Sequence, residues 1–113
     1  MIPALLAALL LAPDHHCSTA ITTVDMVECI GRSTTEWDEL LNTAYREALA
    51  RVAEPQQARL RGAQRAWILY RDANCRAYGA AEGTISAIAA ASCLRDMTQS
   101  RAEELQRFGA GEN

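Results

Sequence analysis

The feature that most constrains this chain is a helical period that continues along nearly its whole length. From Thr23 onward, apolar side chains recur at steps of three and four residues, as they do along one face of an α-helix. The period breaks at Glu54-Pro55, where proline suits the first turn of a new helix, and at the glycine-bounded segment 79–83. The sequence therefore predicts three helices, at about 23–53, 55–78 and 84–108.

The predicted fold class is all-α, an antiparallel three-helix hairpin or bundle. No alternation of the kind found in strands is visible, and short connections favour antiparallel packing of successive helices. A length of 113 residues corresponds to one domain, which we place at 23–108, followed by a frayed tail at 109–113. The second helix also carries apolar side chains on a further face, at Ile68, Leu69 and Cys75, which predicts neighbours on both sides.

The first predicted helix contains two possible starting points. Thr22 or Thr23 can cap its beginning. Gly31 and the run 33–36, of sequence STTE, form a second capping signal inside it, at which a helix can bend or restart. We expect one long helix.

The first residues resemble the core of an export signal. Leu5 to Leu11 is an uncharged apolar run that is too short to span a bilayer. We therefore predict a signal peptide at 1–12, an N-terminal arm at 13–22 and an exported protein, periplasmic or secreted, without stable membrane insertion after processing. A cytosolic helix is the competing interpretation of this run.

Four cysteines in an exported chain of this size predict disulfides, for which three pairings exist. Zinc sites usually contain close pairs such as C-x-x-C. The separations here are 12, 46 and 18 residues, so a metal site built from His15, His16 and these thiols is the weaker interpretation. We expect no metal and no cofactor.

Folding the first two helices back on each other at Glu54-Pro55 places polar and aromatic side chains level with one another. We expect them to form a structural polar layer, because buried polar groups need partners. The predicted pairs are Asp38 with Arg71, Asn42 with Trp67, and Tyr45 with Gln64.

The second turn gives a register of the same kind. It places Cys75 level with Cys93, and Arg101 level with Trp67 in the polar layer. We therefore predict the disulfide Cys75–Cys93. Cys29 lies too far along for Cys75, which leaves Cys17 as its partner.

No catalytic site is evident. The chain contains no set of nucleophile, base and orienting group, no phosphate-binding loop and no metal-ligand spacing, so we do not expect an enzyme. The net charge of −3 and the lack of an evident basic patch argue against a nucleic-acid partner.

Taken together, these motifs resemble the LprI-type lysozyme inhibitors, small exported bacterial proteins. The similarity runs from about Cys17 to Leu105 and has its densest part at 63–75, AQRAWILYRDANC. The other matching pieces are Cys17, Thr23 to Cys29, Asp38-x-x-Leu41-Asn42-x-x-Tyr45, Gly83-Thr84, Cys93, and Met97-Thr98-x-x-Arg101 to Leu105. The resemblance implies a helical, disulfide-bonded domain that inhibits a lysozyme.

An inhibitor of this kind can offer a donor group to the two carboxylates of a lysozyme cleft. The candidates are Arg76 and Tyr78 beside the loop 79–83, and His15-His16 in the arm. Glu82 can steer a basic lysozyme toward the inhibitor by long-range attraction. The alternative function is a periplasmic structural or adaptor module without lysozyme inhibition.

Overall fold

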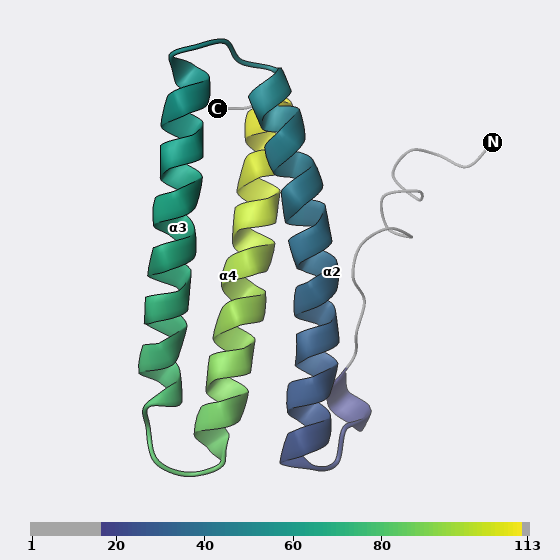
Figure 1. The fold of residues 1–113 in the computed structure, drawn as a ribbon. Coiled ribbons are helices and arrows are strands. Elements are labelled where there is room, and N and C mark those ends of the chain that lie inside the picture. The colour runs from purple at the N-terminus through teal and green to yellow at the C-terminus, as the bar shows by residue number, and fades with distance from the viewer. Residues whose placement is uncertain (1–16, 112–113) are drawn as a thin grey trace, which may run out of the picture.

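A computed structural model describes residues 17–111, which form four helical elements (Figure 1). A single turn of 3-10 helix, η1 (Cys17–Thr19), precedes the long helices α2 (Thr23–Ala50), α3 (Gln56–Gly79) and α4 (Ile85–Gly109). The three predicted helices are confirmed, with ends that lie within three residues of those expected. Within this part of the chain, no helix is both long and apolar enough to cross a membrane.

α2 is one continuous helix. Thr22 caps it, because its Oγ1 accepts a hydrogen bond of 3.0 Å from the backbone N–H of Asp25. The second capping signal is not used as a cap: the Thr34 hydroxyl donates to the carbonyl oxygen of Ile30, four residues earlier. The helix therefore passes through Gly31 without a break.

α4 is the central helix of the molecule. It lies between α2 and α3 and packs against both of them, whereas α2 and α3 barely contact each other (Figure 1). α2 and α4 run in the same direction, and α3 runs antiparallel to both. The arrangement is thus an open three-helix bundle with one closely packed pair, α2 and α4.

Small side chains let α2 and α4 approach closely. At the C-terminal ends of the two helices, a Cβ on Gly109 would lie 3.6 Å from the backbone nitrogen of Ala48. Gly109 is the last residue of α4 and is buried, which corrects the expectation that the frayed tail starts there. The buried core cluster extends from this contact through Leu41, Ala44, Ala48, Leu60, Ala102 and Leu105.

The central position of α4 makes the predicted seam between α2 and α3 wrong. Arg71 does not pair with Asp38; it bonds its neighbour Asp72 at 2.9–3.0 Å and lies over the ring of Trp67, 5.0 Å from the ring centre. Asn42, the expected partner of Trp67, is exposed.

The remaining members of the predicted layer turn toward α4 or the core. Tyr45 packs against the core cluster and has no hydrogen bond to Gln64. Gln64 is buried, and its Oε1 accepts a hydrogen bond of 2.9 Å from the Nε of Arg101. The polar contact that does form therefore joins α3 to α4.

The expectation that α3 has neighbours on both sides is also wrong. Among residues 17–111, α4 is the one helix packed along it. Leu69 is therefore 72% exposed and Ile68 39% exposed.

Candidate functional site

The end of the α3–α4 hairpin is the best candidate for a binding site. We call it the hairpin tip and define it as Arg76, Tyr78, the loop residues 80–84 and Ile85. It combines exposed side chains with a base that is fixed by a covalent bond.

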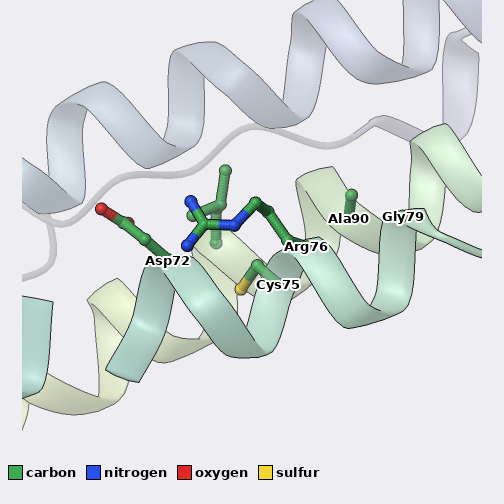
Figure 2. A pocket seen from close by; sticks show the side chains of 6 residues that line it. Asp72, Cys75, Arg76, Gly79 and Ala90 are labelled. Atoms are coloured by element: carbon green, nitrogen blue, oxygen red, sulfur yellow. The ribbon is translucent and has the colours of Figure 1, made fainter. Parts of the chain in front are cut away.

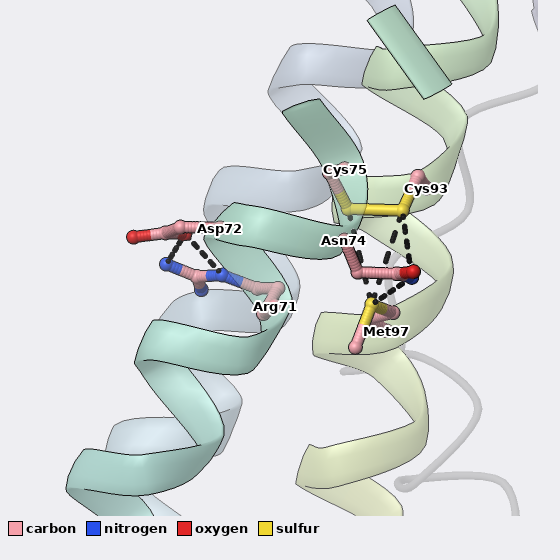
Figure 3. The surroundings of a disulfide bond; sticks show 6 residues. All are labelled: Arg71, Asp72, Asn74, Cys75, Cys93 and Met97. Atoms are coloured by element: carbon pink, nitrogen blue, oxygen red, sulfur yellow. Dashed lines mark hydrogen bonds and ion pairs between the residues drawn. A yellow bond between two sulfur atoms is a disulfide. The ribbon is translucent and has the colours of Figure 1, made fainter. Parts of the chain in front are cut away.

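The disulfide Cys75–Cys93 forms this base, with a Cα–Cα distance of 5.4 Å (Figure 3). The Met97 Sδ lies 3.8 Å from each of its sulfur atoms. Asn74 Nδ2 also approaches the same Met97 sulfur, at 3.3 Å. Four side chains from two helices thus meet at the base of the tip, so α3 and α4 cannot slide past each other there.

Glycines shape the backbone of the tip. At Gly79 an added Cβ would lie 3.3 Å from the Cβ of Ala90, so the end of α3 approaches α4 closely there. Gly83 has a φ of 95°, a conformation that disfavours other residues. Its carbonyl oxygen accepts a hydrogen bond of 2.7 Å from the hydroxyl of Ser86. The loop therefore has a defined conformation as it enters α4.

The side chains of the tip are turned toward solvent. Tyr78 is 54% exposed and Ile85 is 72% exposed, and Arg76 and Glu82 are exposed as well. Arg76 has no ion-pair partner among residues 17–111. Arginine and tyrosine are each enriched among the residues that dominate the binding energy of protein interfaces.

A shallow pocket of about 400 Å³ opens in the seam behind the tip (Figure 2). The Asp72 and Arg76 side chains both extend from α3 on the side of this pocket. Cys75, Gly79, Ala90 and Leu94 complete the lining. The pocket has an apolar floor with one anionic and one cationic group at its rim, so it can accept a side chain of a bound protein.

Trp67 borders a different seam pocket, of about 420 Å³, together with Arg101 and Met97. Arg101 is held by Gln64 on one side and by an ion pair with Glu104 on the other. Its role is therefore to join α3 to α4. Trp67 and Arg101 line the same pocket, but the cation over the indole ring is Arg71.

Arg76 and Tyr78 lie in the last turn of α3 and line different pockets, and Glu82 lies in the loop that follows; the part that these three candidates play in binding stays a prediction. His15 and His16 lie outside the described residues. Sequence reasoning missed Ile85, although a large apolar residue in the first turn of a helix, next to a glycine loop, is a detectable signal. Within 17–111, no cluster of histidine, cysteine and carboxylate side chains is suited to a metal ion.

Both predicted disulfides are confirmed. Cys17–Cys29 ties η1 to the first turns of α2, with a Cα–Cα distance of 5.8 Å, and Cys75–Cys93 ties α3 to α4. All four cysteines of the chain are thus used in pairs.

A helical hairpin that is fixed by a disulfide fits the comparisons with known proteins. The family model described as "Lysozyme inhibitor LprI" matches residues 14–105. The chain belongs to the LprI lysozyme inhibitor family. The match includes all four cysteines and the hairpin tip, so the structural features described above lie within the family region.

A related protein carries no functional name. It is an uncharacterized protein of Rhizobium meliloti (strain 1021), with 28% identity over 111 residues that cover 85% of this chain and 80% of the relative. No solved structure matches the chain.

Proposed function

We propose that this protein is exported and that it binds a lysozyme outside the cytoplasm, blocking hydrolysis of the cell wall. The observation that carries the proposal is the match to the lysozyme inhibitor family over residues 14–105. Two disulfides support export, because such bonds form and persist in oxidising compartments. The protein acts as a binding protein and not as an enzyme.

The hairpin tip is the surface that contacts the lysozyme. It is a short turn between two helix ends with its side chains exposed to solvent, so it can enter a concave substrate cleft. Arg76 donates to the pair of working carboxylates in that cleft, and Tyr78, which lines a different pocket of the α3–α4 seam, supplies a separate apolar contact. The disulfide base reduces the entropy that the tip loses on binding, which strengthens the complex.

Acidic groups steer the encounter. Glu82 in the tip and Asp96 on α4 are exposed, and the chain carries a net charge of −3. They attract a basic lysozyme from a distance and raise the association rate. Added salt screens this attraction, so the association rate falls as ionic strength rises.

Lysozyme-driven clearing of a cell-wall suspension tests the proposal. The oxidised protein recovered after export should slow clearing in a dose-dependent manner. Arg76→Ala with Tyr78→Ala should raise the half-inhibitory concentration by about 1,000-fold, since interface anchors of this kind contribute about 2 kcal/mol each, and each such loss weakens binding about 30-fold.

The same helix supplies a matched control. Arg65→Ala with Tyr70→Ala removes the same two residue types from exposed positions of α3 away from the tip, and should leave inhibition unchanged. Equal losses in the two variants would refute the assignment to the tip. A folded, oxidised protein that inhibits no lysozyme class would refute the inhibitor function and favour the adaptor module.

A further inference from the structure

The three helices divide the charge of the molecule unequally. α3 carries five arginines and one aspartate, a net charge of +4. α2 carries six carboxylates and two arginines, a net charge of −4. Because α4 lies between them, the basic helix and the acidic helix form opposite edges of the molecule (Figure 1). The small net charge of the whole chain hides this separation.

The side of α3 that faces away from α4 combines cations with exposed apolar groups. We call it the outer face of α3 and define it by six exposed residues: Arg59, Arg65, Ala66, Leu69, Tyr70 and Ala73. Leu69 is 72% exposed and Tyr70 is 61% exposed. The alanines between them add no bulk, so these two large side chains project from the helix.

The arginines of the outer face are not used by the fold. Arg61 pairs with Glu54, and Arg71 pairs with Asp72. Arg59 and Arg65 have no ion-pair partner among residues 17–111. Arg59 also lies in the first turn of α3, where the helix dipole disfavours a positive charge. Helix stability therefore does not explain why a cation stands there.

We propose that the outer face of α3 docks on a bilayer surface that contains anionic phospholipids. In this arrangement Leu69 and Tyr70 enter the headgroup region, and Arg59 and Arg65 lie at the level of the lipid phosphates. Long arginine side chains reach the phosphates while their methylene stems cover apolar surface. Tyrosine suits this zone because its ring is apolar and its hydroxyl is polar.

The shape of the face favours a lipid surface over an acidic protein. Leu69 and Tyr70 project from a convex helix, and the α3–α4 pockets are lined by other residues. A deformable headgroup layer accommodates such side chains without a preformed groove. Docking through α3 also turns the carboxylates of α2 away from the anionic surface, on the far side of α4.

Vesicle co-sedimentation tests this proposal with the oxidised protein recovered after export. One vesicle is pure phosphatidylcholine, and in the other about one lipid in three is phosphatidylglycerol. The protein should sediment with the anionic vesicle alone. Arg59→Gln with Arg65→Gln should weaken binding about 25-fold, at about fivefold per arginine. Leu69→Ser with Tyr70→Ser should weaken it by about tenfold or more.

α2 supplies the control. Arg32→Gln with Arg46→Gln causes the same loss of charge at exposed positions of that helix and should change binding by no more than about twofold. Equal effects of the α2 and α3 pairs, equal binding to both vesicles, or binding to soluble polyglutamate but not to vesicles would each overturn the proposal. Unchanged lysozyme inhibition by the Arg59/Arg65 variant would show that this face and the hairpin tip are separate surfaces.

Discussion

Removing the disulfide Cys75–Cys93 should abolish inhibition, and removing Cys17–Cys29 should not. The two bridges close loops of similar length, with sequence separations of 18 and 12 residues. Loop-closure entropy depends on the logarithm of that length, so each bridge contributes about 3 kcal/mol through the unfolded state. A double Cys→Ser change at either bridge should therefore lower the free energy of unfolding by nearly the same amount.

The two bridges differ in what they hold in the folded state. Cys75–Cys93 lies directly at the base of the hairpin tip and fixes α3, along which α4 is the one helix packed among residues 17–111. Cys17–Cys29 joins η1 to the start of α2, and neither element belongs to the tip. Only the first bridge preorganises the proposed lysozyme contact.

Two assays separate stability from tip geometry. Urea unfolding followed by circular dichroism measures the free energy of unfolding of each variant. Clearing of a cell-wall suspension then measures inhibition at a low temperature, at which both variants are folded. If both variants inhibit equally well, or lose inhibition in proportion to their loss of stability, the claim that Cys75–Cys93 preorganises the tip is refuted.

Three further changes test the packing of the fold by urea unfolding. Gly31→Ala should raise the free energy of unfolding by about 0.5–1 kcal/mol, because Gly31 is an exposed helical residue and an added Cβ would have no atom within 4 Å. A lower free energy of unfolding would contradict the continuous helix. Thr98→Val should add about 1 kcal/mol, because the buried Thr98 hydroxyl has no hydrogen-bond partner among the described residues, and a loss would reveal a partner. Gln64→Leu should cost about 1–3 kcal/mol, because it leaves the Arg101 Nε without its acceptor; a neutral effect would refute that contact as a tie between α3 and α4.

The sequence was sufficient to predict the helices and the disulfides. Both follow from position along the chain: the apolar period marks the helices, and the hairpin register at the second turn places Cys75 beside Cys93. Arg76, Tyr78 and Glu82 lie near the same loop because they are close in sequence, and their part in binding stays a prediction.

The sequence was not sufficient to predict which helices pack together. The register of a helical hairpin predicts which residues of two successive helices lie at the same height along the helix axes. It does not predict whether a third helix lies between them. The small residues Ala48 and Gly109 carried a signal of the close contact between α2 and α4. The sequence contains no signal for the partner of Arg71, because Asp38 and Asp72 are equally plausible partners by charge alone.

The place of α4 also determines when the chain can fold. The partners that bury Leu41 and Ala44 on α2 include Ala102 and Leu105, close to the C-terminal end of the chain. Contacts between residues so far apart in sequence form late, because a long loop must close first. A nascent chain therefore has no complete core until the C-terminal half of α4 has been made. The proposed export requires an unfolded chain that has not yet closed its disulfides, and this delay supplies one.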